Sequence, residues 1–142
     1  MEFVFDSYCG VFCGACPIML ATNAGKLEQD KQCFGCKSEK PTGYCKTCGI
    51  KACANKQGID FCIQCTQMTN CDLFQKFTSD PVYQYGQCVI KNMEKIQIIG
   101  LQNWLEMQAK RWRCKNCGET QSWYQESCPR CGQFVENYKA DL

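Results

Sequence analysis

The chain has 142 residues, 16 of them cysteine, no histidine, and a formal net charge of +2 at pH 7. A cysteine share of about 11% exceeds the level typical of domains held together by disulfides or metal ions. The small net charge argues against a strongly basic nucleic-acid-binding surface. Zinc binding would make the net charge negative, because each zinc ion held by four thiolates adds a charge of about −2. The 8 Phe, 6 Tyr and 3 Trp residues argue against an unstructured metal-storage peptide and indicate a folded core.

The N-terminal residues, MEFVFDSYCG, have neither the basic segment nor the apolar segment of a secretory signal peptide. We therefore expect a cytoplasmic protein. In a reducing cytosol, closely spaced cysteines bind metal more often than they form disulfides. No apolar run has the length needed to cross a bilayer, so we do not expect a membrane partner.

Residues 1–80 combine most of the cysteines with short helical segments. One predicted helix opens at Pro17, which suits the first helical position, and ends near Gly25, which suits a helix C-terminus. A second helix is predicted from about Asp72 through Phe77. Both helices begin directly after a cysteine, so a metal site can anchor them.

Residues 81–112 contain a single cysteine and have the pattern of two helices that form a hydrophobic spine. Asp80 and Pro81 are a typical N-cap and first helical residue. The first helix is predicted to run to a break at Gly100, and its apolar residues at helical spacing are Val89, Ile90, Met93 and Ile96. The second helix places on one face the apolar residues Leu101, Trp104, Leu105 and Trp112.

The strongest motif lies in residues 113–135, where two C-x-x-C-G turns provide the cysteines Cys114, Cys117, Cys128 and Cys131. The glycine after each pair suits a turn that bends toward the sulfur atoms and needs a positive φ. The segment between the turns, ETQSWYQES, is predicted to form a short two-stranded hairpin. The motif resembles a zinc ribbon, or the metal site of a rubredoxin. Zinc is the default metal, because the sequence gives no sign of a redox partner.

The cysteines of the N-terminal part are predicted to complete the metal sites, which gives about three to four zinc ions per chain. The preferred grouping combines Cys33 and Cys36 with Cys48 and Cys53, and Cys13 and Cys16 with Cys62 and Cys65. The cysteines left for a third site, or as free thiols, are Cys9, Cys45, Cys71 and Cys88. An interleaved grouping stays open, and so does an iron–sulfur cluster. Cys9, Cys13 and Cys16 have the spacing of the radical-SAM cluster loop. A radical-SAM enzyme is rejected, because the chain is too short for the large partial barrel of such enzymes.

Together these elements predict a small, metal-stabilised α+β protein. Residues 1–112 would form a cysteine-rich metal-binding domain with short helices and the helical spine of residues 81–112. Residues 113–135 would form the zinc ribbon hairpin, and residues 136–142 a short tail.

Several strings of the sequence also resemble one known family. They are CGVFCGAC at residues 9–16, CFGC at 33–36, CKTCGIKACANKQGIDFCIQC at 45–65, and IIGLQNWLEMQAKRWRCKNCG at 98–118. The chain is similar to a family of small prokaryotic cysteine-rich proteins catalogued as a domain of unknown function and regarded as zinc-binding. The resemblance implies metal binding and leaves the biological role open.

The absence of histidine favours structural over catalytic metal, because catalytic zinc usually keeps an open position and mixes histidine or carboxylate with cysteine. The sequence also lacks a Gly-rich phosphate loop and a histidine base, so an enzyme is not favoured. The predicted function is a zinc-binding interaction module whose partner is a protein. One alternative is a redox or metal-responsive sensor that uses Cys9, Cys71 or Cys88, and another is an iron–sulfur protein. A less favoured alternative is nucleic-acid binding through the basic residues Lys110, Arg111, Arg113 and Lys115.

Overall fold

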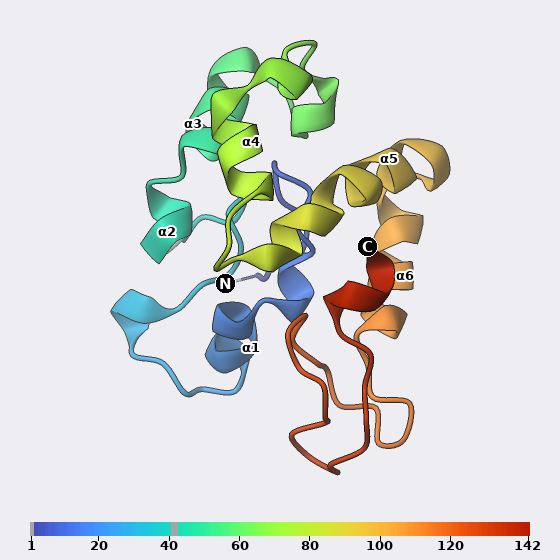
Figure 1. Ribbon diagram of the computed structural model, residues 1–142. Helices are drawn as coiled ribbons and strands as arrows, with labels where there is room; N and C mark the ends of the chain where they lie inside the picture. The colour runs from blue at the N-terminus through green and yellow to red at the C-terminus, as the bar shows by residue number, and fades with distance from the viewer. Residues whose placement is uncertain (1, 41–42) are drawn as a thin grey trace.

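Short helices joined by loops make up the computed structural model, which describes residues 2–40 and 43–142 (Figure 1). The α-helices are α1 (Pro17–Asn23), α2 (Gly43–Lys46), α3 (Gly49–Gln57), α4 (Asp72–Thr78), α5 (Val89–Ile99) and α6 (Leu101–Arg111). Short 3-10 segments are η1 (Cys13–Ala15), η2 (Gln29–Lys31), η3 (Cys62–Gln64), η4 (Met68–Asn70), η5 (Gln84–Cys88) and η6 (Tyr138–Asp141). Within the described part of the chain, none of the helices has the length and apolar character needed to cross a membrane.

Helices α1 and α4 lie where the sequence predicts them. Pro17 is the first residue of α1, and Gly25 follows its C-terminus with φ +69°. The Gly25 amide donates to the Thr22 carbonyl at 3.1 Å and so satisfies one of the last carbonyls of the helix. Helix α4 begins at Asp72, directly after a cysteine. Helix α3 was not predicted from the sequence, because its apolar residues have a weak helical periodicity.

The central helix pair is confirmed, but its first helix begins later than predicted. Helices α5 and α6 pack against each other on either side of Gly100, whose φ is +87°. The predicted start at Pro81 is wrong, because the Asp80 carboxylate closes a turn instead of capping a helix. It accepts hydrogen bonds from the amides of Val82 and Tyr83 at 2.7 and 3.2 Å. The chain then forms η5 before α5 begins.

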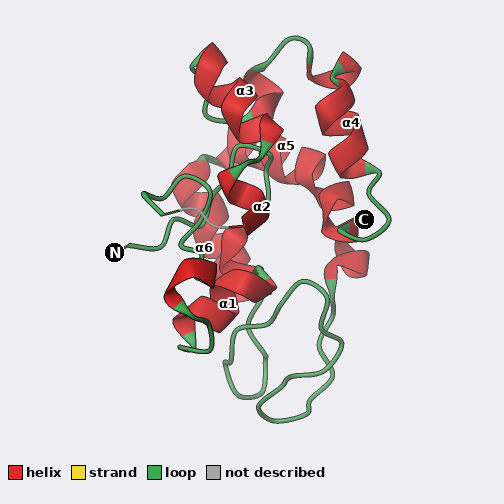
Figure 2. Ribbon diagram, turned by 90° about the vertical axis from the view of Figure 1, so that its left-hand side faces the viewer, coloured by secondary structure: helices red, strands yellow, loops and turns green. Residues whose placement is uncertain are grey.

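The predicted α+β class and ribbon hairpin are wrong, because the fold is mostly helical. Residues 2–40 and 43–142 contain no β-strand (Figure 2), and two isolated antiparallel bridges join Arg113 to Thr120 and Ser127 to Phe134. Each bridge closes one C-x-x-C turn on itself. The segment between the turns does not pair across a hairpin, because its Trp123 side chain is buried in the core of the protein.

One hydrophobic cluster connects the N-terminal part, the helix pair and the C-terminal part. The largest fully buried side chains at its centre are Val89, Met93, Trp104 and Trp112. Residues 136–142, expected to be a tail, contribute η6, which lies near α6 in Figure 1. The Tyr138 side chain of η6 is buried in the same cluster. The two C-x-x-C turns are therefore flanked on both sides by residues that pack in the core.

Candidate metal centre

Four cysteine sulfur atoms meet near the C-terminal end of the chain. The Sγ atoms of Cys114, Cys117, Cys128 and Cys131 all lie within 4.8 Å of one another. The Sγ atoms of Cys114 and Cys131 are 3.6 Å apart, and those of Cys117 and Cys128 are 3.5 Å apart. In a tetrahedral zinc site with Zn–S bonds of about 2.3 Å, the sulfur atoms are about 3.8 Å apart. These four cysteines, the C-terminal group, are therefore arranged so that they can hold one metal ion.

Each cysteine pair of the C-terminal group is carried by the same backbone turn. The Cys114 amide donates to the Glu119 carbonyl at 2.8 Å, and the Gly118 amide donates to the Cys114 carbonyl at 2.8 Å. The second turn repeats both bonds around Cys128, at 2.8 and 2.9 Å. Gly118 and Gly132 have φ of +80° and +78°, a conformation that a side chain disfavours. The expectation that each turn needs a glycine is confirmed.

Hydrogen bonds stabilise the thiolate form of Cys128. Burial acts to raise the pKa of this thiol, but hydrogen bonds from the Cys131 amide, the Gln121 side chain and the Arg130 amide lower its pKa to about 6. The Gln121 side chain is itself buried. Because the thiolate is the form that binds metal, these contacts prepare the turn for an ion.

Trp123 joins the two C-x-x-C turns to the rest of the protein. Its ring stacks on that of Tyr85, with centroids 4.2 Å apart and an interplanar angle of 8°. Its indole N–H donates to the Phe12 carbonyl at 3.1 Å, and its backbone amide donates to the Ala15 carbonyl at 3.3 Å. This role was not predicted from the sequence, where Trp123 was assigned to a short two-stranded hairpin. The signal against a hairpin was the adjacent pair Trp123 and Tyr124, which breaks the alternation of apolar and polar residues.

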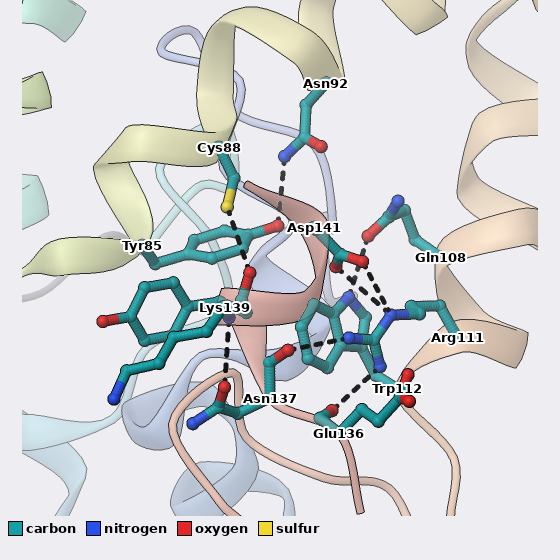
Figure 3. Close-up of polar contacts among 11 residues, drawn as sticks. Tyr85, Cys88, Asn92, Gln108, Arg111, Trp112, Glu136, Asn137, Lys139 and Asp141 are labelled. Carbon is teal, nitrogen blue, oxygen red and sulfur yellow. Dashed lines mark hydrogen bonds and ion pairs between the residues drawn. The ribbon is translucent and has the colours of Figure 1, made fainter.

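Arg111 holds the last residues of the chain against helix α6 (Figure 3). Its guanidinium donates to the Asp141 carboxylate at 3.2 Å and to the carbonyls of Glu136 and Asn137 at 3.0 and 2.9 Å. It also lies over the Trp112 ring, 4.1 Å from the centroid. These contacts give Arg111 a structural role within the basic run of residues 110–115.

Five N-terminal cysteines lie in a first neighbourhood, around α1 and α2. They are Cys13, Cys16, Cys33, Cys36 and Cys45. Burial, followed by neighbouring cysteines, raises the pKa of Cys13. A hydrogen bond with Cys33, followed by burial, raises the pKa of Cys45. Cys9 and Cys48 lie near Cys36. The structure thus places Cys13 near Cys33 and Cys36, whereas the predicted grouping assigned it to another site.

The other four N-terminal cysteines line a single cavity between α3, η3 and α4. They are Cys53, Cys62, Cys65 and Cys71. The predicted grouping had separated Cys53 from Cys62. Among the residues that the structure describes, the C-terminal group is the one whose sulfur atoms all lie within 4.8 Å of one another. Metal binding by the N-terminal cysteines therefore stays a prediction.

Cys88 lies apart from all these groups. Its side chain is 2% exposed, and its thiol donates to the Tyr138 carbonyl at 3.7 Å (Figure 3). Burial raises the pKa of Cys88 to about 11. A buried, protonated thiol is unreactive and acts as a packing residue.

A family model described as a protein of unknown function (DUF3795) matches residues 5–76. The chain belongs to this family, as the resemblance of its sequence predicted. The matched residues contain the N-terminal cysteines, and the C-terminal group lies outside them. No curated protein and no solved structure matched the chain.

Proposed function

We propose that this protein binds zinc and that its metal sites are structural. The observation that carries the proposal is the C-terminal group, with its four Sγ atoms within 4.8 Å of one another. Four thiolates fill the coordination sphere of zinc and leave no position for water or substrate, so an ion held there is not a catalyst. The ion would join the two turns to each other, and Trp123 joins both turns to the core.

Elemental analysis of the full chain, purified without added metal, tests the identity of the metal. We expect bound zinc and a colourless protein. Iron also accepts four thiolates, so a coloured sample that contains iron would contradict the assignment. A variant in which the C-terminal group is replaced by serine should lose one zinc ion per chain. The matched control is Cys88→Ser, which should lose none, because this thiol lies in the core away from every cysteine group.

We also propose that the metal-held fold is an interaction module for a protein partner. Structural zinc supplies folding free energy and leaves function to the surface that it holds in place. Arg111 is bound to the C-terminal residues, which leaves the basic run with fewer cations to offer a nucleic acid and favours a protein partner.

Affinity purification of the tagged chain, with and without nuclease treatment, tests the class of partner. The control is the serine variant of the C-terminal group. We expect a protein that is retained by the wild-type chain after nuclease treatment and is not retained by the variant. Recovery of nucleic acid as the retained component, with no retained protein, would contradict the proposal.

A further inference from the structure

The cavity lined by Cys53, Cys62, Cys65 and Cys71 has the size of an ion site. Its volume is about 30 Å³. Pockets for organic ligands are about ten times larger, whereas a single ion between four sulfur atoms needs no more space than this. The cavity is therefore suited to one metal ion.

The four cysteines come from three elements that pack together. Cys53 lies on α3, Cys62 and Cys65 lie at the two ends of the η3 turn, and Cys71 directly precedes α4. Helices α3 and α4 contact each other and lie side by side in Figure 1. The Cys65 amide donates to the Cys62 carbonyl at 2.9 Å, so a tight turn carries this C-x-x-C pair, as at the C-terminal group. Metal bound here would fasten α3 to α4.

The rest of the lining supplies no competing ligand. Apart from the cysteines and Gln57, its members are the apolar residues Ile50, Ala54, Ile59, Met68, Leu73 and Phe74. The sulfur atoms are therefore the donor atoms that suit a metal, and four thiolates select a tetrahedral ion such as zinc.

Two N–H groups are directed at these sulfur atoms. The Gln57 side-chain amide donates to Cys53 Sγ at 3.2 Å, and the Gln67 backbone amide donates to Cys65 Sγ at 3.4 Å. Hydrogen bonds of this kind stabilise a thiolate and are the usual second layer of contacts around a thiolate-bound metal. Packing thiols are fully buried, as Cys88 is, whereas these four are only partly buried. Cys62 and Cys71 also pack against the hydrophobic cluster, but packing alone does not require the N–H groups directed at Cys53 and Cys65.

Cys9 is the nearest rival ligand. The Cys62 amide donates to the Tyr8 carbonyl at 2.8 Å, which brings Cys9 close to Cys62. However, Cys9 does not line the cavity, and its Sγ lies 3.5 Å from Ser7 Oγ. The cavity lining therefore favours these four cysteines over a set that includes Cys9.

We infer that zinc draws Cys53, Cys62, Cys65 and Cys71, whose sulfur atoms do not all lie within 4.8 Å of one another in this structure, into a second closed four-thiolate site. Binding releases the proton of each thiol that is protonated and leaves a tetrahedral ion with a net charge of about −2. This site goes beyond the proposed function of the C-terminal group and does not depend on it, because the two share no residue. It lies within the residues matched by the family model.

Proton–cadmium correlation NMR of the full chain loaded with cadmium-113 tests the ligand set without any mutation. We expect one cadmium resonance to correlate with the β-protons of Cys53, Cys62, Cys65 and Cys71 together. A resonance that correlates with Cys9 in place of one of these residues would overturn the assignment. The absence of any correlation from these four residues would do the same.

Zinc counting by native mass spectrometry provides the second test. The double variant Cys53→Ser/Cys71→Ser should carry one zinc ion fewer than the control Cys88→Ser. An unchanged zinc count in the double variant would refute the second site. The separate variant Cys114→Ser/Cys117→Ser reports on the C-terminal group, so failure of the second site and failure of the proposed function give different results.

Discussion

Replacement of Trp123 by alanine tests whether the two C-x-x-C turns are docked on the core. The ring is 6% exposed and stacks on Tyr85. Loss of a buried aromatic side chain costs about 3–5 kcal/mol. The Phe12 carbonyl also loses its indole donor, which adds about 1 kcal/mol. With a urea m-value of about 2 kcal/mol/M, the midpoint of unfolding should fall by about 2–3 M.

The assay is equilibrium urea unfolding followed by far-UV circular dichroism, at one fixed concentration of free zinc. The matched control is Phe134→Ala, another aromatic residue beside the turns, which is 70% exposed and should change stability by less than about 0.5 kcal/mol. The zinc content of Trp123→Ala should match that of the wild type, because no ligand is changed. If Trp123→Ala is no more destabilising than Phe134→Ala, the ring does not dock in the core. The prediction of an independent hairpin would then be supported instead.

Three further changes have defined outcomes. Gln121→Leu removes the buried side-chain amide that helps to lower the pKa of Cys128. Zinc binding at the C-terminal group should weaken by about 10–100-fold in a competition titration with a chelator. An unchanged affinity would refute the role of the amide. Lys37→Met removes the partner of Asp6, whose carboxylate lies 2.8 Å from the ammonium, and should cost about 2 kcal/mol in urea unfolding, with part recovered in the double variant with Asp6→Asn. Gly35 has φ +110°, and a Cβ added there would lie 2.1 Å from the Val4 carbonyl oxygen. Gly35→Ala should therefore lower the free energy of unfolding by more than about 2 kcal/mol. Gly58→Ala, with φ +68° and open space, should cost about 1 kcal/mol, and equal thermal shifts for the two would contradict the close approach.

Features set by neighbouring residues could be predicted from the sequence. The two C-x-x-C-G turns follow from local spacing and from the positive φ that Gly118 and Gly132 adopt. Helix α1 is likewise fixed by Pro17 at its start and Gly25 after its end. In each case the residues that decide the structure lie within the element or directly beside it.

The hairpin was predicted wrongly because its fate depends on contacts far away in the sequence. Trp123 contacts Phe12 and Tyr85, and neither contact can be predicted from the residues next to Trp123 in the sequence.

The start of α5 also depends on contacts outside the helix itself. Asp80 is equally suited to a helix cap and to a turn, and the backbone at Gly86 approaches the end of α4 so closely that a Cβ would lie 2.8 Å from the Phe77 carbonyl.

The grouping of the N-terminal cysteines could not be predicted for a physical reason. A C-x-x-C pair fixes which two sulfur atoms act together but not which second pair they meet. Loop-closure entropy rises only slowly with loop length, so several pairings of Cys53, Cys62 and their neighbours have similar cost in the unfolded chain. The packing of α3 on α4 decides among them.

Zinc K-edge X-ray absorption of the full chain, purified without added metal, tests the central claim most directly. Closed four-thiolate sites predict a zinc spectrum with about four sulfur neighbours at about 2.3 Å and no nitrogen or oxygen neighbour. A nitrogen or oxygen ligand in the first coordination shell would show an open or mixed site and contradict the account. A sample without zinc would contradict it as well.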